Sequence, residues 1–212
     1  ILIAQFTGAD NEREAWCSLN VSLICGALLS GLFLLAVGGF PGQILGLYTA
    51  DGGILQAGAA YFQIVAFAYL PMALSTVLSA WLRCKDHAAI PFLASLGAVA
   101  ANTGLNYLLI FGKLGFAPMG VRGAAIATLI SQLLNFLLIL LGFAAGLKKD
   151  GTQPLWTLHF TTITLRKYGG MVLPILVSEF LWSLGQNVES AVYGHLGTAN
   201  LAAYTLTCPI QS

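Results

Sequence analysis

Long apolar segments alternate with short polar segments along the whole chain. Five of them are long enough to cross a membrane, and they cover residues 15–40, 53–82, 88–112, 123–147 and 168–194. A transmembrane helix needs about 20 consecutive, predominantly apolar residues. The first four runs carry no charged residue, and the fifth carries only Glu179 and Glu189. The pattern therefore predicts an all-α fold, a polytopic bundle of membrane helices.

Both ends of the sequence are apolar as well. Residues 1–6 are predicted to be the end of an earlier span, and residues 199–212 the beginning of a later one. No positively charged region precedes the first apolar run, so this run is not typical of a signal peptide. We therefore expect an internal stretch of a larger membrane protein, with five complete spans and two partial ones.

The composition agrees with a lipid environment. Hydrophobic residues make up 58% of the chain and charged residues 8%, whereas a soluble domain carries about 25% charged residues. A net charge of +1 provides no basic surface for nucleic acid. The four cysteines form no CxxC pair, and they are interpreted as small apolar residues without a metal site, a disulfide framework or a cofactor.

Lysine and arginine are unevenly distributed between alternate loops. The loops at 7–14, 83–87 and 148–167 carry seven of them, and the loops at 40–53 and 112–123 carry two. Cytoplasmic loops carry the excess of Lys and Arg in membrane proteins. The charges therefore predict that the loops at 7–14, 83–87 and 148–167 are cytoplasmic.

Glu179 lies near the middle of the last complete span, where a charged side chain is costly unless it is paired or hydrated. Three polar residues follow it on one face of the helix, at i+4, i+7 and i+11: Ser183, Gln186 and Ser190. One interpretation is a cavity-facing stripe in which Glu179 carries a proton or binds a transported Na⁺. The alternative is a protonated carboxyl that donates a hydrogen bond to a neighbouring helix. Glu189 lies off this stripe and is interpreted as a solvated carboxylate or part of a cavity wall.

The spans at 88–112 and 123–147 each carry polar residues along one face. The first has Asn102 and Asn106, four residues apart, and the second has a stripe of Thr128, Ser131, Gln132 and Asn135. Such side chains either form hydrogen bonds between helices or line a hydrated, ion-binding pocket. We predict that Asn102, Asn106 and Thr128 point into one shared interior space, because unpaired amides facing lipid are costly.

Two local features should shape the packing of the helices. Pro71, inside the second apolar run, removes a backbone hydrogen bond and should kink its helix. The pairs Gly26/Ser30 and Gly142/Gly146 have the small-xxx-small spacing that allows membrane helices to approach closely.

Motifs of enzymes and of ATP-driven pumps are absent from the sequence. There is no HExxH, no GxSxG, no DDxxD-type acidic cluster and no Walker glycine loop. We therefore expect no enzymatic activity, and any transport should be driven by an ion gradient.

Six segments occur in a characteristic order along nearly the whole chain. They are IAQFTGADNEREA (3–15), RCKDHAAIP (83–91), NTGLNYLLIFG (102–112), GVRGAAIATLIS (120–131), VLPILVSEFLWSLG (172–185) and HLGTANLAAYTL (195–206). Together they resemble the MATE family of multidrug and toxin extrusion transporters, in particular its bacterial NorM-like members.

The resemblance implies a transporter of twelve helices in two six-helix lobes. Residues 1–147 would run from the end of helix 2 through helix 6, so that the amino-terminal lobe is nearly complete. Residues 148–167 would be the cytoplasmic linker between the lobes, and 168–212 would contain helix 7 and the start of helix 8. The protein would be a monomer in the bacterial inner membrane.

The resemblance also implies roles for individual residues. Asn102 and Asn106 match positions that line the cavity of the amino-terminal lobe, and Thr128 matches the wall of that cavity. Many family members carry Asp where this chain has Asn106, so a cation or proton site there would depend on an acid elsewhere. Glu179 matches an acidic position implicated in cation coupling, and Ser183 and Gln186 share its stripe.

The implied function is a Na⁺- or H⁺-coupled antiporter that exports amphipathic organic cations or drugs by alternating access. The alternative, within the same superfamily, is a flippase for lipid-linked oligosaccharides. Flippases of that kind tend to line the cavity with Arg and Lys, whereas the basic residues of this chain lie at the ends of its spans.

Overall fold

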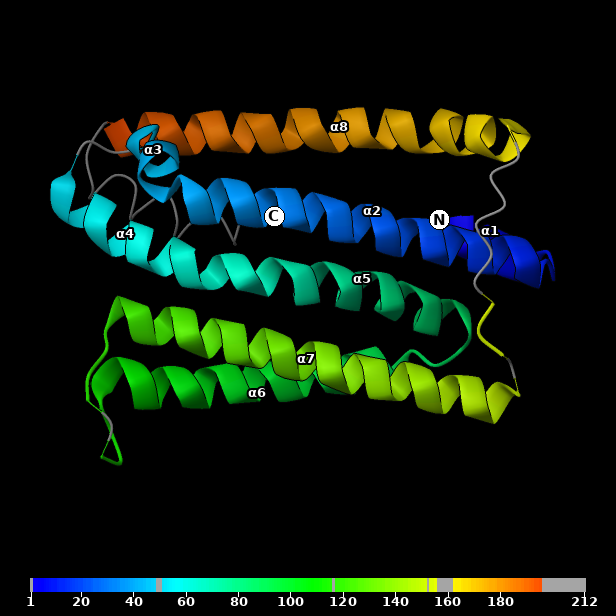
Figure 1. Cartoon of the computed structure of the whole chain (residues 1–212), viewed down its shortest axis with the longest axis horizontal. Helices are drawn as coiled ribbons and strands as arrows, with labels where there is room; N and C mark the ends of the chain where they lie inside the picture. The colour runs from blue at the N-terminus through cyan, green and yellow to red at the C-terminus, as the bar shows by residue number, and fades with distance from the viewer. Residues whose placement is uncertain (1, 49–50, 116, 152, 156–161, 196–212) are drawn as a thin grey trace. The chain divides into compact units, whose positions relative to one another are not determined.

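The computed structural model describes residues 2–48, 51–115, 117–151, 153–155 and 162–195, which form helices and contain no strand. The predicted all-α fold is confirmed. In chain order (Figure 1) the elements are α1 (Leu2–Gly8), α2 (Glu12–Gly39), α3 (Pro41–Gly46), α4 (Gly52–Val65), the 3-10 turn η1 (Ala66–Ala68), α5 (Tyr69–Cys84), α6 (Ala89–Phe111), α7 (Val121–Asp150) and α8 (Thr162–His195).

All five predicted spans are helical. The first four correspond to α2, to the continuous run from α4 through η1 to α5, to α6 and to α7, and each is long and apolar enough to cross a membrane. α8 contains the fifth span; it is not one of the four described helices assigned as able to cross a membrane.

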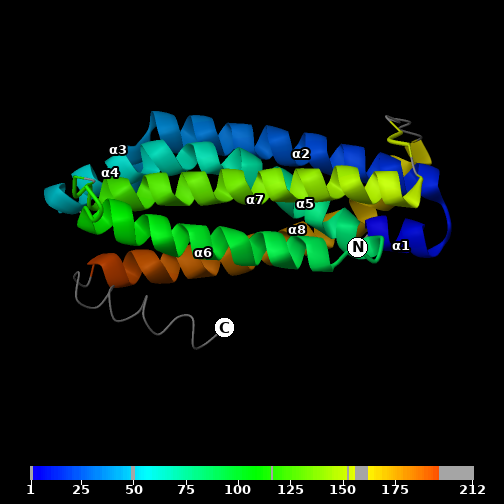
Figure 2. The same ribbon diagram turned by 90° about the horizontal axis from the view of Figure 1, so that it is seen from below.

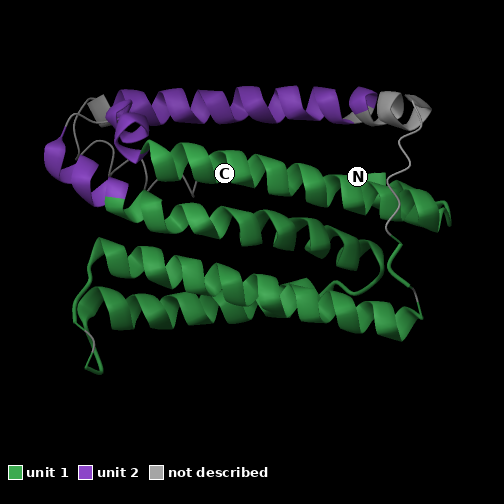
Figure 3. Ribbon diagram, viewed as in Figure 1, with its two compact units in different colours: residues 1–40, 60–159 green, residues 41–59, 160–212 purple. Residues whose placement is uncertain are grey.

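The chain divides into two compact units (Figure 3). The first unit contains Ile1–Phe40 and Ala60–His159, and therefore α1, α2, the end of α4, and η1 through α7. The second unit contains Pro41–Ala59 and Phe160–Ser212, and therefore α3, the beginning of α4, and α8. The division into two lobes and a linker stays a prediction, and the predicted beginning of a later span at 199–212 lies outside the described residues.

Local sequence explains where the helices begin and end. The side chain of Asn11 accepts a hydrogen bond from the backbone N–H of Glu14 at 3.3 Å and so caps the first turn of α2. α6 and α7 end at Gly112 and Gly151, each with a φ of 65°, a left-handed conformation that glycine adopts without strain. Gly120 precedes α7 with a φ of 54° and a ψ of −126°, which is also a conformation for glycine.

The irregularity predicted at Pro71 takes the form of a 3-10 turn. The turn at Ala66–Ala68 separates α4 from α5 and ends three residues before the proline. Pro71 has no N–H, and its ring crowds the carbonyl of the residue four positions earlier, Phe67. The tighter turn accommodates both effects, and the span from Gly52 to Cys84 continues for 33 residues.

Within the first unit α5 packs between α2 and α7, and α6 packs along α7 (Figures 1 and 2). Glycines allow the close approach of α6 and α7. A Cβ atom on Gly123 would lie 2.7 Å from the backbone oxygen of Leu109, and Gly142 faces the side chain of Ile90. Gly142 therefore lies at the contact between α6 and α7, and Gly146 faces the side chains of His87 and Leu82.

An aromatic cluster of Trp16, Trp81 and Phe143 connects α2, α5 and α7. The rings of Trp16 and Trp81 are 4.5 Å apart between centroids, and both residues are only 2% exposed. Phe143 lies 6.2 Å from Trp16 in an edge arrangement. Lys85 covers the cluster, since its Nζ is 5.6 Å from the Trp81 ring and 3.0 Å from the Glu12 carboxylate. This cluster is the main side-chain core of the first unit.

Large apolar side chains cover the outside of the helices. Leu28 and Leu35 of α2 are 69% and 72% exposed, and Phe92 of α6 is 67% exposed. Soluble monomers rarely expose contiguous apolar surface on this scale, whereas the acyl chains of lipids solvate it. The exposed leucines therefore support the transmembrane assignment of these helices.

Candidate functional site

A ladder of polar side chains connects α6 with α7 between otherwise apolar helices. Asn106 Nδ2 donates to Asn102 Oδ1 at 2.9 Å, and Asn102 Nδ2 donates across the helix pair to Ser131 Oγ at 3.1 Å. Ser131 Oγ donates in turn to the backbone carbonyl of Thr128 at 2.9 Å. We call these four residues the polar ladder; all of them are half-buried or buried.

The structure thus brings three of the predicted site residues together, though not in the same way. Asn102 and Asn106 bond to each other directly, as their spacing of four residues predicts. Thr128 joins through its backbone, because its hydroxyl donates to the carbonyl of Ala124 on its own helix at 2.9 Å. The Thr128 hydroxyl oxygen can still accept a hydrogen bond or contact a cation.

Two side-chain carbonyl oxygens, one on α6 and one on α7, lack a hydrogen-bond partner among the described residues. They are Asn106 Oδ1, at the end of the polar ladder, and Asn135 Oδ1, one turn of α7 beyond Ser131. A buried acceptor without a donor costs about 1–3 kcal/mol, so such atoms call for a water, an ion or a ligand. Oxygen atoms of this kind are suitable ligands for hard cations. Because they are uncharged, they can bind a cation but cannot neutralise it.

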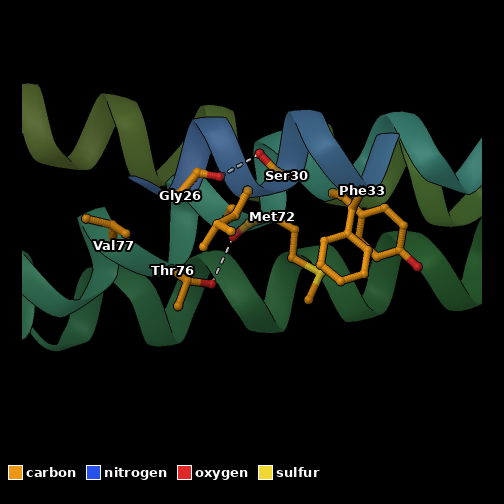
Figure 4. A pocket seen from close by; sticks show the side chains of 9 residues that line it. Gly26, Ser30, Phe33, Met72, Thr76 and Val77 are labelled. Carbon is orange, nitrogen blue, oxygen red and sulfur yellow. Dashed lines mark hydrogen bonds between the residues drawn. The ribbon is translucent and has the colours of Figure 1, made fainter. Parts of the chain in front are cut away.

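A separate pocket of about 390 Å³ lies between α2 and α5 (Figure 4). Its lining consists of Gly26, Leu29, Ser30, Phe33, Tyr69, Met72, Ala73, Thr76 and Val77. Its aliphatic hydroxyls are satisfied within their own helices, Ser30 Oγ by the Gly26 carbonyl at 2.7 Å and Thr76 Oγ1 by the Met72 carbonyl at 2.8 Å. The pocket therefore suits an apolar group rather than an ion.

The polar stripe of α8 belongs to the second unit. Glu179 and Ser183 are exposed, whereas Gln186 and Ser190 are half-buried. Ser190 Oγ donates to the Gln186 carbonyl at 2.8 Å, which uses the serine within the helix. No ion pair among the described residues includes Glu179. The cavity predicted in front of Glu179 stays a prediction.

Two features of these sites were not predicted from the sequence. Gly26 and Ser30 were interpreted only as a close-packing pair, and they also line the apolar pocket. The hydrogen bond between Tyr48 and Asn187, at 2.6 Å, joins residues 139 positions apart. Helical periodicity relates only residues of one helix, so it carries no signal for such a contact.

The helices and the polar groups at their centres define the class of protein. Four described helices can cross a membrane, their outer surfaces are apolar, and their polar side chains gather at the α6–α7 contact. The chain is an integral membrane protein of the polytopic helical class.

Comparison with known proteins identifies the family within this class. The MatE family profile matches residues 1–108, about half of the 212 residues. The chain belongs to the MatE family, which confirms the resemblance seen in the sequence. The probable multidrug resistance protein YoeA of Bacillus subtilis is 31% identical over 224 residues, covering 100% of this chain. The probable multidrug resistance protein NorM of Rhizobium meliloti is 30% identical over 221 residues, again covering 100%.

The relatives are longer than this chain. Its alignments cover 46% of YoeA and 45% of the Rhizobium meliloti NorM. The probable multidrug resistance protein NorM of Thermotoga maritima is 30% identical over 139 residues, which cover 62% of this chain and 28% of that protein. The chain therefore spans about half the length of the relatives that it matches in full. No solved structure matches it.

Proposed function

We propose that the full-length protein is a cation-coupled antiporter that exports amphipathic organic cations or drugs by alternating access. Its coupling ion would be Na⁺ or H⁺, and its partners would be small organic molecules and the lipid bilayer. Membership of the MatE family and the names of the relatives support a transporter of drugs. The basic residues of the chain flank the predicted spans and none lies within one, which favours this proposal over a flippase for lipid-linked oligosaccharides.

The polar ladder is the structural observation that supports the proposal most directly. A network that served only to hold α6 against α7 would be expected to satisfy its own polar atoms. The ladder instead leaves Asn106 Oδ1 without a donor, and Asn135 Oδ1, one turn of α7 beyond Ser131, is also unpaired among the described residues. An organic cation with N–H groups, or a partly hydrated ion, supplies what these oxygens lack. The apolar side chains around them suit the rest of an amphipathic substrate.

Glu179, in the second unit, is a separate candidate site that carries a charge. The ladder residues Asn102, Asn106 and Thr128 are neutral. They can contact a cation, but they carry no charge for which the coupling ion and the drug could compete. A carboxylate in a membrane helix must be balanced by a proton, a metal ion or an organic cation. Competition between the coupling ion and the drug for Glu179 therefore links their movements, while Ser183 and Gln186 offer further oxygen ligands on the same stripe.

The proposed location is the bacterial inner membrane, with the protein acting as a monomer and its loops at 7–14, 83–87 and 148–167 in the cytoplasm. Two side-chain pairs in the first unit support placing these loops on one side. Lys85 forms a salt bridge with Glu12 at 3.0 Å, and His87 Nε2 is within hydrogen-bond distance of the Asp150 carboxylate at 3.1 Å. Each pair joins residues that lie in or beside loops of the predicted cytoplasmic group.

Gradient-driven transport by the purified full-length protein in liposomes tests this function. A fluorescent organic cation inside the vesicles should leave faster when an opposing Na⁺ or H⁺ gradient is imposed, and an ionophore that collapses the gradient should abolish the difference. Vesicles without protein provide the baseline. The proposal would be overturned by an efflux rate that is the same with and without either gradient. Transport of a fluorescent lipid-linked sugar in place of the cation would also overturn it.

A further inference from the structure

The apolar pocket between α2 and α5 is a groove on the outer surface of the first unit (Figure 4). Three of the side chains that line it, Leu29, Phe33 and Met72, are 57%, 56% and 47% exposed. Side chains that line a pocket and are about half exposed form its rim. The described helices of the first unit therefore leave the groove open to the surroundings of the protein.

Small residues at the contact between the two helices create the space. A Cβ atom on Gly26 would lie 3.9 Å from Cβ of Ala73 and 3.9 Å from Cγ2 of Val77, so the helices meet where their side chains are small. At the other end of the groove, the rings of Phe33 and Tyr69 are 6.1 Å apart between centroids. The groove extends between these two contacts, along the axes of both helices.

The groove belongs to the part of the helices that crosses the hydrocarbon core of the membrane. Both α2 and the run that contains α5 are long and apolar enough to span it, and no charged residue lines the groove. From Tyr69 to Val77 the groove covers about 12 Å along a helix axis. Arg83, the first charged residue of this run, follows Val77 by a further distance of about 9 Å. Acyl chains, and not water, therefore surround the groove.

A single acyl chain fits this groove better than the alternatives do. Apolar cavities stay dry, which argues against ordered water. A helix with its side chains is about 10–12 Å wide, which is too large for a groove of about 390 Å³. An acyl chain is narrow and flexible, and acyl chains already solvate neighbouring side chains of α2 such as Leu28 and Leu32, which are 69% and 63% exposed. The groove is thus continuous with the lipid-facing surface.

The groove face of α5 leads to an exposed basic residue. The α5 residues of the groove recur every three or four positions, which is the spacing of one helix face. The same spacing continues from Thr76 through Ala80 to Arg83, and the last two are exposed. No ion pair among the described residues includes Arg83, whereas the neighbouring Lys85 is paired with Glu12 at 3.0 Å. The guanidinium group of an arginine binds phosphate through two parallel hydrogen bonds.

From this arrangement we propose that the first unit binds one membrane phospholipid. An acyl chain occupies the groove between α2 and α5, and the phosphate of the lipid contacts Arg83. A headgroup with a net negative charge binds more tightly than a neutral one, because a basic residue near the membrane surface attracts it. The proposal depends on the transmembrane assignment of the two helices. It depends neither on the transport activity nor on which side of the membrane Arg83 faces.

Photo-cross-linking in a membrane tests the site. The probe is a phosphatidylglycerol with a photoreactive diazirine in one acyl chain, diluted into phosphatidylcholine liposomes that contain the full-length protein. Mass spectrometry should find more cross-links on residues 26–33 and 69–77 than on residues 92–99 of α6, where Phe92 and Val99 are 67% and 63% exposed. Equal yields on all three segments would overturn the proposal. So would the absence of cross-links at 26–33 and 69–77, the result expected if another helix of the full-length protein covers the groove.

Filling the groove should remove the excess of cross-links. Thr76 and Thr103 form a matched pair, because both are exposed and each hydroxyl donates to the backbone carbonyl four residues earlier, at 2.8 Å and 2.9 Å. Thr76 lines the groove, whereas Thr103 belongs to α6. Thr76→Phe should therefore lose the excess at 26–33 and 69–77, and Thr103→Phe should retain it. The same yields in the two variants would contradict an acyl chain in the groove.

The headgroup contact is tested at the same segments. In Arg83→Gln, the concentration of phosphatidylglycerol for half-maximal cross-linking should rise about fivefold, the contribution of one basic residue near the membrane surface. Arg122→Gln is the control, since Arg122 is exposed in the first turn of α7. A diacylglycerol with the same photoreactive chain has no phosphate and should cross-link equally to the wild type and to Arg83→Gln. Equal half-maximal concentrations of phosphatidylglycerol, or a diacylglycerol yield that depends on Arg83, would overturn the phosphate contact.

Discussion

The amide of Asn102 donates a hydrogen bond to the hydroxyl of Ser131, 3.1 Å away on the neighbouring helix, and accepts one from Asn106 at 2.9 Å. Asn102 is therefore the connection between the two helices of the polar ladder. Asn106 is positioned through it, with its own carbonyl oxygen left without a donor among the described residues.

Removing this connection should impair transport more than stability. Asn102→Ala loses two hydrogen bonds, each worth about 0.6 kcal/mol in a membrane protein, so the free energy of unfolding should fall by only about 1 kcal/mol. Efflux should fall by roughly tenfold, because Asn106 is no longer held in place, a loss equivalent to about 1.4 kcal/mol. Thr103→Ala is the control, since Thr103 is exposed and its hydroxyl bonds only to Val99 of its own helix. Equal efflux by the two variants at equal abundance would argue against a site at the ladder.

A carboxylate at position 106 should make substrate binding depend on pH. Asn106→Asp keeps the size of the side chain and adds a group that is neutral at low pH and negative at high pH. Affinity for an organic cation should therefore increase as pH rises, whereas the wild-type ladder contributes no such dependence. The measurement is a binding titration with a fluorescent cation across a pH series, with Thr103→Asp as the control for added charge. Parallel pH profiles for the wild type and Asn106→Asp would contradict contact between the ladder and the substrate.

The contact between α6 and α7 should be sensitive to a single methyl group. Gly123→Ala places a Cβ 2.7 Å from the Leu109 backbone oxygen, so the helices must separate, at a cost of about 1–3 kcal/mol for overpacking. Gly104→Ala in α6 meets no atom within 4 Å and should instead stabilise the helix by about 0.5–1 kcal/mol. In detergent, the midpoint of thermal unfolding should be lower for Gly123→Ala than for the wild type, and it should not be lower for Gly104→Ala. The opposite order would contradict the close packing of Gly123 against Leu109.

The sequence predicted the helices well because membrane spans are determined by length and hydrophobicity. The 88–112 run, for example, corresponds to α6 at Ala89–Phe111, and the glycine at its end explains the boundary. The proximity of Asn102 and Asn106 was also predictable, since helical residues four apart share a face.

The partners of these residues on other elements were not predictable. Whether Asn102 meets Ser131, Thr128 or Asn135 depends on how far α7 is shifted along α6, which is set by contacts such as Gly123 against Leu109. The approach of Tyr48 to Asn187 likewise depends on how α3 folds after Pro41. Periodicity within one helix contains no information on either relationship.

Replacement of Glu179 by glutamine tests the central claim most directly. Glu179→Gln keeps the size and the hydrogen-bonding capacity of the side chain and removes the charge for which the coupling ion and the drug compete. In the full-length protein, membrane abundance should stay nearly the same as in the wild type. The gradient-driven part of fluorescent-cation efflux should be lost, while Glu189→Gln, off the polar stripe, should keep most of it. Gradient-driven efflux at the wild-type rate in Glu179→Gln would show that Glu179 does not couple the ion to the drug.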